Sequence, residues 1–385
     1  MKKREISGDT SIENVLRDIF RINLGVKKYE RVLLFNDKVS EKEDIDESDI
    51  ERRSRLRSLS LLAAEIGKNY CKSIIYHEYP ATGSHGAEPP EELWELAFGK
   101  KAVATLKKKR LILPILKKNT KDSDIKSAED VIRRYKKNTV DCVIAISNYS
   151  TSHTRFRDFL TRICGCRYAS MPLFDISMLE GAMNVDWKAL AKRTIGIAKI
   201  MNMADFIKVK TPNGTFISFS KKGRKARSDT GILTGKGSFG NLPSGEVYLA
   251  PVEETAFGRL VLEWGPTRHL ESPVILTVKD GYVVDISGKD KYAEYLSMRL
   301  SEKNENGNIA EFGIGTNASA KRPDNILESE KILGTIHIAL GDNSSFGGNI
   351  KTPFHQDFVF FKPTVTLIHK DGSRKKILKN GRLLC

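Results

Sequence analysis

The chain has 385 residues, of which 64 are lysine or arginine and 48 are aspartate or glutamate, so its formal net charge is +16. With 40% hydrophobic and 29% charged residues, the composition is typical of a folded globular protein and excludes a disordered or fibrous chain. No apolar run reaches the roughly 18 residues of a membrane span, and no hydrophobic segment follows the basic residues at the start. We therefore expect a cytoplasmic protein without a membrane partner.

The five cysteines are an odd number in a long chain, which indicates reduced thiols and not a disulfide framework. Cys164 and Cys166 form a CxC pair without a second CxxC or a nearby histidine, so we interpret them as small buried residues. The basic residues fall into clusters such as 107–110, 221–225 and 373–382, without the aromatic side chains of a base-stacking groove. We therefore do not expect a nucleic-acid partner, although a basic nucleic-acid-binding protein without enzymatic activity stays an alternative.

The first half of the chain alternates between short apolar runs and helical patterns. Buried strands separated by helices of ten or more residues predict an α/β layer with a mainly parallel sheet covered on both faces. None of the strands is followed by a glycine motif for nucleotide phosphates, so nucleotide binding there is unsupported. The apolar runs lie at 31–37, 72–79 and 141–149, and the helical patterns at 11–25, 52–70, 128–138 and 156–165.

The second half follows a predicted helix at 185–204 and changes to the two-residue alternation of antiparallel strands. Three turn signals interrupt this alternation, each of a type that connects the strands of a hairpin. One more helix is predicted at 291–304. We therefore expect an N-terminal α/β domain over 1–190 and a hairpin-rich, mixed or antiparallel α+β catalytic domain over 191–385. The turn signals are Asn213-Gly214, Asp280-Gly281 and Asp371-Gly372.

Histidine and aspartate side chains near the C-terminus suggest a metal site. His355 and Asp357 are two residues apart, so on a strand both side chains point to the same side. His337 lies in an apolar run upstream, and the segment between the two histidines is rich in glycine, asparagine and serine, as in loops that pass close to a ligand. No serine occupies a GxSxG turn and no cysteine has a histidine in its motif, so a metal fits better than a nucleophile triad.

Two carboxylates stand in apolar surroundings beside glycines. Glu246 follows the turn NLPSG, and Glu311 begins the run EFGIG. An ionised carboxylate in such a place is costly unless a cation or hydrogen bonds compensate it. Each residue alone also has a plain explanation, Glu246 as an exposed residue beside a turn and His337 as a hydrogen-bonded core histidine.

The motifs NLPSGEV-x-x-AP, AE-x-GIGTN, HIALGDN-x-x-FGG and H-x-D, in this order, resemble the M29-type metallo-aminopeptidases, the family of aminopeptidase T and thermophilic aminopeptidases. The segments 166–172, 178–187 and 211–220 are similar to that family as well. The resemblance covers about residues 155–385, and the N-terminal part is more divergent.

The resemblance implies a two-metal aminopeptidase whose bridging water attacks the first peptide bond of a short peptide. The cofactors would be two divalent ions, with zinc, cobalt and manganese all plausible. The family's dimers imply a homodimer here. Glu253 or Glu254 is the nearest candidate for the general acid that protonates the leaving nitrogen. The residues that match the family's metal ligands are Glu246, Glu311, His337, His355 and Asp357.

One position departs from the family pattern. Aminopeptidases of the family carry a tyrosine in the loop after the first histidine, and the equivalent residue here is Ser344. Loss of a donor to the tetrahedral intermediate would cost about 2–4 kcal/mol of transition-state stabilisation. Asn343 or Ser345 would be the substitute donor, and peptidase activity depends on that substitution.

The same scaffold is similar to a dihydroxypyridine ring-cleaving dioxygenase, which binds one ferrous ion through two histidines and an aspartate. His337, His355 and Asp357 would form that triad. Glu246 and Glu311 argue for the hydrolase, because a mononuclear iron centre has no use for two further acids. The two alternatives differ in metal stoichiometry, two ions per chain for the hydrolase and one oxygen-sensitive iron for the dioxygenase.

Overall fold

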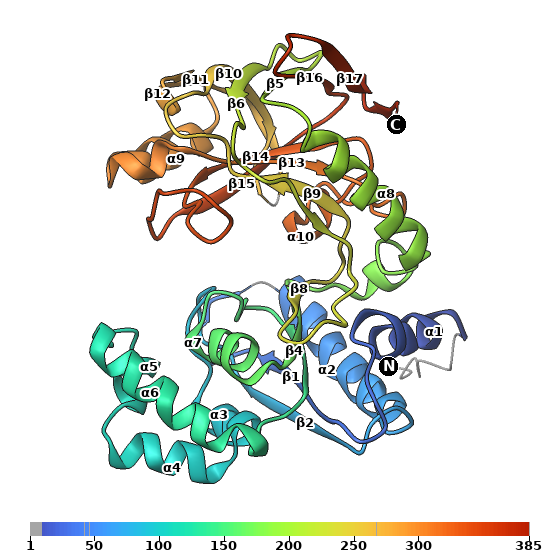
Figure 1. Cartoon of the computed structure of the whole chain (residues 1–385), viewed down its shortest axis with the longest axis vertical. Helices are drawn as coiled ribbons and strands as arrows, with labels where there is room; N and C mark the ends of the chain where they lie inside the picture. The colour runs from blue at the N-terminus through green and yellow to red at the C-terminus, as the bar shows by residue number, and fades with distance from the viewer. Residues whose placement is uncertain (1–9, 42, 46, 267, 385) are drawn as a thin grey trace. The chain divides into compact units, whose positions relative to one another are not determined.

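The structure is a computed structural model and describes residues 10–41, 43–45, 47–266 and 268–384. The chain forms two compact units, drawn in Figure 1. Unit 1 comprises Met1–Asn184 and Gly231–Pro243, and unit 2 comprises Val185–Thr230 and Ser244–Cys385. One boundary is predicted at 190 from the sequence, whereas the chain leaves unit 1 near residue 184 and returns to it for a short segment. That return depends on a long-range strand pairing, which linker composition does not signal.

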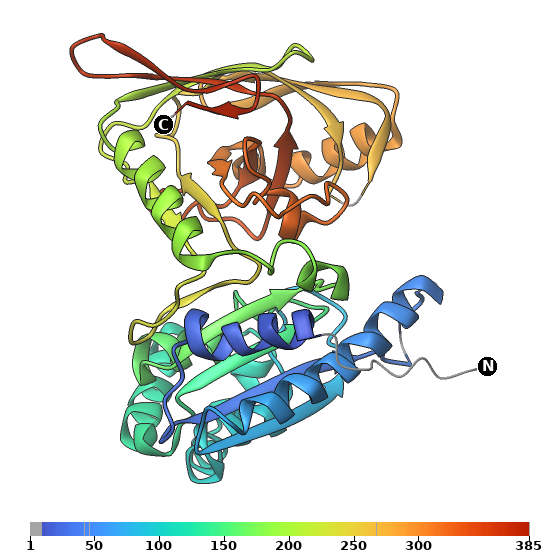
Figure 2. The ribbon, with the colours of Figure 1, turned by 90° about the vertical axis from the view of Figure 1, so that its right-hand side faces the viewer.

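The sheet of unit 1 has five parallel strands in the order β2-β1-β3-β4-β8. Its central strand, β3, is buried throughout, because helices cover both faces of the sheet (Figure 2). The predicted parallel α/β layer is confirmed. The strands are β1 (Arg31–Lys38), β2 (Ser73–Pro80), β3 (Cys142–Ser147), β4 (Arg167–Pro172) and β8 (Phe239–Asn241).

The helices of unit 1 pack on the two faces of this sheet. Helices α1 and α2 contact each other, and α2 packs on β1 and β2. Helices α3 to α7 and η3 enclose an aromatic core. In that core, Trp94 lies 5.1 Å from Phe98 and 5.5 Å from Phe156, measured between ring centroids. The helices are α1 (Thr10–Asp18), η1 (Ile19–Asn23), α2 (Glu47–Gly67), α3 (Glu91–Phe98), α4 (Lys100–Lys108), α5 (Ile112–Leu116), α6 (Asp122–Tyr135), η2 (Lys136–Asn138), α7 (Arg155–Asp158), η3 (Phe159–Cys164) and η4 (Ile176–Leu179).

Glu88 makes the stability of unit 1 depend on pH. Its carboxylate is 7% exposed and accepts hydrogen bonds from the backbone N–H groups of Arg155 and Phe156, at the start of α7. Burial outweighs these bonds and raises the pKa of Glu88 from 4.5 to about 7. The folded state therefore binds this proton more tightly than the unfolded state, so the stabilisation is complete below pH 4.5 and is lost as the pH rises through 7.

We expect the free energy of unfolding of the wild type, relative to Glu88→Gln, to fall by up to about 3 kcal/mol between pH 4.5 and 8. Urea unfolding of both proteins across this range measures the difference. The amide side chain of the variant does not titrate, and the other titratable groups contribute equally to both proteins. The difference between the two unfolding free energies therefore reports Glu88 alone. A difference that stayed constant, or that rose with pH, would contradict the assigned pKa.

Unit 2 is built from two antiparallel sheets. The larger has the order β12-β11-β10-β6-β5-β16-β17-β18, and the smaller, which we call sheet C, has the order β15-β14-β13-β9-β7. The three predicted turns connect β5 to β6, β11 to β12 and β16 to β17, which confirms the hairpin-rich, antiparallel second half. The strands of the larger sheet are β5 (Phe206–Lys210), β6 (Phe216–Ser220), β10 (Phe257–Trp264), β11 (His269–Lys279), β12 (Tyr282–Ser287), β16 (Thr364–Ile368), β17 (Arg374–Lys379) and β18 (Arg382–Leu383).

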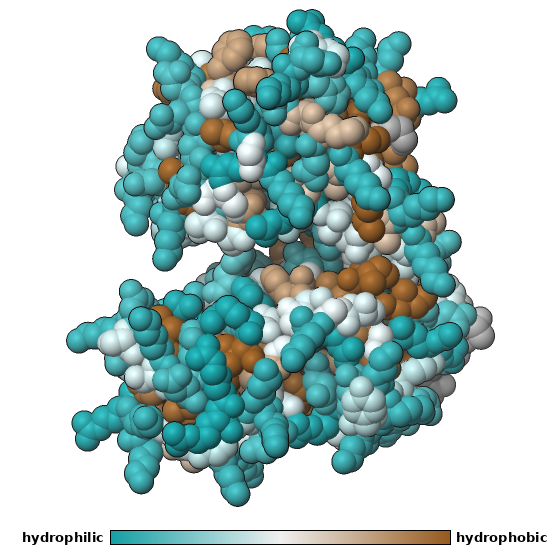
Figure 3. All heavy atoms as spheres, in the orientation of Figure 1, coloured by the Kyte–Doolittle hydropathy of each residue, from teal (hydrophilic) through white to brown (hydrophobic). Residues whose placement is uncertain are grey.

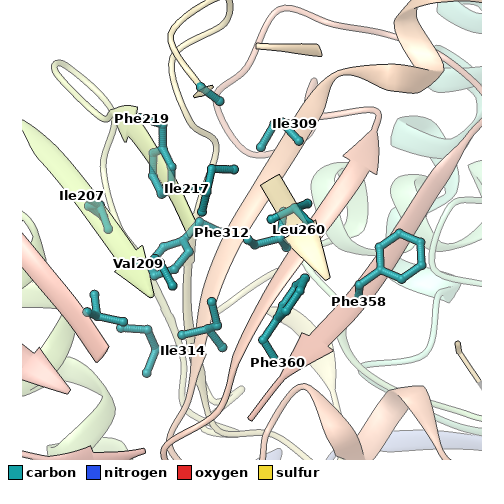
Figure 4. Packing of buried hydrophobic residues seen from close by; sticks show 14 of the residues in the cluster. Ile207, Val209, Ile217, Phe219, Leu260, Ile309, Phe312, Ile314, Phe358 and Phe360 are labelled. Atoms are coloured by element: carbon teal, nitrogen blue, oxygen red, sulfur yellow. The ribbon is translucent and has the colours of Figure 1, made fainter. Parts of the chain in front are cut away.

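The core of unit 2 lies between these two sheets, as Figure 4 shows. Phe219 of the larger sheet packs 5.3 Å from Phe312 of sheet C, and Leu260 and Phe360 lie beside them. The remaining elements of the unit are the strands β7 (Arg227–Asp229), β9 (Glu246–Leu249), β13 (Ile309–Gly315), β14 (Ile336–Gly341) and β15 (His355–Phe360), and the helices α8 (Trp187–Met201), α9 (Lys291–Ser301), η5 (Asn304–Gly307) and α10 (Ile326–Ser329).

The surface carries mainly hydrophilic side chains on the face that Figure 3 draws, over both units. Within the described part of the chain, no helix combines the length and the apolar character needed to cross a membrane.

Candidate metal site

Four neighbouring strands of sheet C carry the five side chains that the sequence analysis singles out as metal ligands. Side chains alternate along a strand, so the apolar residues Phe312 and Ile338 pack into the core while their neighbours point to the opposite face. That opposite face gathers the polar residues. Glu246 is on β9, Glu311 on β13, His337 on β14, and His355 and Asp357 on β15.

The five side chains form two groups that share Glu311, and in each group one ligand atom per residue lies within 4.8 Å of the others. In the first group, His337 Nε2 is 3.2 Å from Glu246 Oε2 and 3.4 Å from Glu311 Oε1. In the second, His355 Nε2 is 3.5 Å from Glu311 Oε2 and 3.4 Å from Asp357 Oδ2. Glu311 therefore lies between the two imidazoles.

The electrostatics of the site favour a cation. Burial opposes charge on both imidazoles, but Glu311 and Glu246 raise the pKa of His337 to about 9, and Asp357 with Glu311 raises that of His355 to about 10. Burial likewise opposes charge on Asp357, but the positive charge of His355 holds its pKa below the usual range. Protons and divalent cations bind to the same carboxylate-rich cluster, so metal binding here releases protons.

The orientation of His355 suits a metal ligand. Its Nδ1 lies 2.7 Å from the carbonyl oxygen of Asp342. A carbonyl only accepts hydrogen bonds, so Nδ1 carries a proton and donates it, and in the neutral ring Nε2 keeps a lone pair. Nε2 is the atom that faces Glu311 and Asp357. This is the usual outer-shell arrangement of a metal-bound histidine.

Gly313 makes room for His337. The two residues are directly opposite in the ladder between β13 and β14. A Cβ at position 313 would lie 2.0 Å from Cε1 and 2.1 Å from Nε2 of the imidazole, where no atom fits. The glycine of the GIGTN motif is therefore needed for space. In the sequence this glycine is visible only as part of a family motif, and its role in making space depends on the pairing of β13 with β14.

Lys331 is the site residue that sequence reasoning missed. Its ammonium is fully buried and lies 3.0 Å from Glu246 Oε1 and 2.6 Å from Glu330 Oε2. In the sequence, Lys331 directly follows Glu330, and an adjacent pair of opposite charges is usually exposed to solvent on the surface. In the fold it gives Glu246 a permanent positive partner, so one oxygen of this expected metal ligand already has its counter-charge.

The expected catalytic residues organise the loop after β14. Glu253 Oε1 accepts hydrogen bonds from Asn343 Nδ2 at 3.0 Å and from the N–H of Asn349 at 2.8 Å, and Oε2 forms an ion pair with Arg224. Asn343 Oδ1 accepts a bond from the N–H of Ile350 at 2.8 Å. Glu253 and Asn343 therefore have structural partners that hold the loop in place.

The other three residues considered for catalysis are on the surface. Glu254 is exposed and has a backbone φ of 62°. Ser344 is exposed too, and its hydroxyl donates to the carboxylate of Asp342 at 3.0 Å. Ser345, the second suggested donor, is likewise exposed.

An aromatic edge borders the ligand cluster. Tyr248 is two residues after Glu246 on β9, so it points to the same face of sheet C. The ring of Phe346 lies 5.8 Å from that of Tyr248 and 6.0 Å from that of His355, edge to face in both cases. The loop rich in glycine and serine therefore places an apolar ring beside the expected ligands, which suits a flat ligand.

A family model described as 2,5-dihydroxypyridine 5,6-dioxygenase (NicX) matches residues 182–384, more than half of the chain. The chain belongs to the 2,5-dihydroxypyridine 5,6-dioxygenase family. A curated dioxygenase of that name from Pseudomonas putida is 24% identical over 182 residues, which are 43% of this chain and 52% of that protein. The match thus spans about half the length of this relative.

Solved structures extend the likeness to the whole fold. The 2,5-dihydroxypyridine dioxygenase from Pseudomonas putida KT2440 aligns with 98% of this chain and 98% of its own at a TM-score of 0.68 and 17% identity. Wild-type AmpT from Thermus thermophilus, an M29 aminopeptidase, covers 98% of this chain and 99% of its own at a TM-score of 0.60 and 16% identity. At these identities the two structures support the fold and the shared scaffold.

The expectation of a metal-dependent aminopeptidase is wrong, and with it the expected hydrolase and protease activity. Both the family model and the curated relative belong to the ring-cleaving dioxygenase. The reason for the error is that both kinds of enzyme share one scaffold. The sequence motifs identify that scaffold and do not distinguish the two reactions. A metal centre itself is consistent with the family and with the two ligand groups of sheet C. The general-acid role of Glu253 or Glu254 and the peptide substrate have no further basis.

Proposed function

We propose that this protein is a dioxygenase that binds one ferrous ion and opens a dihydroxylated aromatic ring of the 2,5-dihydroxypyridine class. The observation that carries the proposal is the family match, together with the two ligand groups on one face of sheet C, one holding His337 and the other His355 and Asp357, which share Glu311. Two histidines and a carboxylate are the usual ligands of mononuclear non-haem iron. The residues that would hold the ion are His337, His355 and Asp357, with Glu311 between the two imidazoles.

A ferrous ion would supply the one-electron chemistry that lets dioxygen react with an electron-rich ring. The chain's own residues would bind and orient the ring. Phe346, whose ring lies beside the imidazole of His355, and Tyr248 offer an aromatic edge against which a flat substrate would pack. Both oxygen atoms enter the ring-opened product, so the reaction needs no external reductant.

Lys331 supports a single ion over a pair. A second divalent ion near Glu246 would face a buried ammonium 3.0 Å from that carboxylate, and two positive charges in a site of low dielectric repel strongly. The two-ion occupancy by zinc, cobalt or manganese expected from the sequence, and the homodimer, stay predictions that metal analysis and sedimentation test.

The decisive experiment combines metal analysis with oxygen uptake. Protein purified without oxygen and loaded with Fe²⁺ is expected to retain about one iron per chain and to consume one O₂ per molecule of 2,5-dihydroxypyridine. The ring absorbance should disappear at the same rate. His355→Ala should retain less than about a tenth of the iron and of the rate, with an unchanged circular dichroism spectrum. Wild-type protein that holds iron but leaves the ring absorbance and oxygen level unchanged would refute this substrate class.

A further inference from the structure

A cavity of about 630 Å³ in unit 1 has a strongly positive lining. It belongs to the parallel-sheet unit, whereas the candidate metal site belongs to unit 2. The cavity lies at the edge of the sheet where the strands begin, since Arg31 is the first residue of β1 and Arg167 the first of β4. Seven of the fifteen lining residues are lysine or arginine, and two are acidic.

The two acids are already engaged. Glu30 Oε2 forms a buried ion pair with Arg167 and accepts a bond from the N–H of Lys27 at 2.7 Å. Asp141 Oδ2 accepts a bond from the N–H of Arg31 at 2.8 Å. Glu30 is therefore paired with Arg167, and the one remaining carboxylate, that of Asp141, can offset only one of the other six cations of the lining.

Five of the seven cations have no ion-pair partner within the described residues. One of them, Arg31, donates its guanidinium hydrogens to backbone carbonyl oxygens, and the other four are Arg134, Lys136, Lys137 and Lys236. The first three of these four come from the C-terminal end of α6 and the turn after it, and Lys236 comes from the segment that returns to unit 1. The negative end of the helix dipole accounts for cations near the end of α6. It does not account for Lys236, which a distant part of the chain brings to the same cavity.

We propose that this cavity binds a small, multiply charged anion that carries phosphate groups. A cavity lined by one sign of charge concentrates ligands of the opposite sign, and a phosphate-bearing anion would relieve the repulsion between the lysines. The volume is in the range of sites for small ligands. Among the described residues that line the cavity there is no aromatic side chain on which a base could stack, so the lining favours a small anion over single-stranded nucleic acid.

Calorimetric titration of the full chain with sodium tripolyphosphate tests the proposal. The wild type should bind one equivalent, and the affinity should fall as salt increases because the charges are screened. The double variant Lys137→Gln/Lys236→Gln should bind at least about tenfold more weakly. The matched control Lys108→Gln/Lys109→Gln removes the same charge from another exposed part of unit 1 and should bind within about twofold of the wild type.

Three results would overturn the proposal. The wild type could show no binding up to about 1 mM tripolyphosphate, which corresponds to only about 4 kcal/mol of binding free energy. The control variant could lose as much affinity for tripolyphosphate as the test variant. The anion would then respond to the net charge of the protein and not to this cavity. A single-stranded oligonucleotide could bind at the same lysines without being displaced by tripolyphosphate, which would assign the cavity to nucleic acid. None of these outcomes depends on the metal site or on ring cleavage.

Discussion

Gly313→Ala should weaken metal binding by about 10- to 100-fold while the protein stays folded. The added methyl group would lie 2.0 Å from the ring of His337, so the imidazole must leave its position on the ligand face of sheet C. The backbone of Gly313 is extended and allows alanine, and the methyl group is small, so the cost falls on the ligand and not on the strand. Isothermal titration with Fe²⁺ under nitrogen measures the loss directly.

Two further variants separate this effect from a general loss of stability. Gly196→Ala, in helix α8 of the same unit, has no atom within 4 Å of the new Cβ and should bind metal as the wild type does. In the background of His337→Ala the clash is removed, so adding Gly313→Ala should change the melting temperature little. If Gly313→Ala bound iron normally, His337 would not be a ligand, and the proposed centre would have to be rebuilt around Glu311, His355 and Asp357.

The parts of the fold that sequence analysis predicts are those where local patterns agree with the tertiary structure. The Asp280-Gly281 turn follows β11, in which buried and exposed residues alternate, and both turn residues have positive φ, as a two-residue hairpin requires. The two-residue spacing of His355 and Asp357 likewise places both on one face of β15. Turn chemistry and side-chain alternation are encoded within a few residues, so they can be read from the chain directly.

The parts that sequence analysis misses depend on contacts between distant residues. Lys331 faces Glu246 only because the segment before β14 folds back against β9, and nothing beside Lys331 in the sequence distinguishes it from a surface lysine. The motif residues establish the scaffold and the ligand types. The number of ions and the reaction depend on which charges face each ligand, and a buried ammonium changes that balance without changing any motif.

Lys331→Met should lower the free energy of unfolding of the metal-free protein by about 3–5 kcal/mol, or the melting temperature by roughly 10 °C. Glu246 and Glu330 would keep their buried carboxylates and lose the ammonium between them. A divalent cation can replace that charge, so Mn²⁺ or Zn²⁺ should restore stability in proportion to its binding. Thermal unfolding in EDTA and in increasing Mn²⁺ gives both quantities, and metal analysis gives the number of ions bound.

Lys221→Met is the matched control, because Lys221 is a buried lysine of the same unit whose ammonium donates to the carbonyl oxygen of Ala204 at 3.1 Å. Its loss should cost about 1–3 kcal/mol and should not be reversed by metal. Removing the opposing charge as well, in Glu246→Gln/Lys331→Met, should recover part of the stability in EDTA, because fewer charges are left unpaired. If Lys331→Met were as stable as the wild type without metal, the ammonium would not be compensating these carboxylates. The preference for one ion over two would then lose its physical basis, while the family membership would be unaffected.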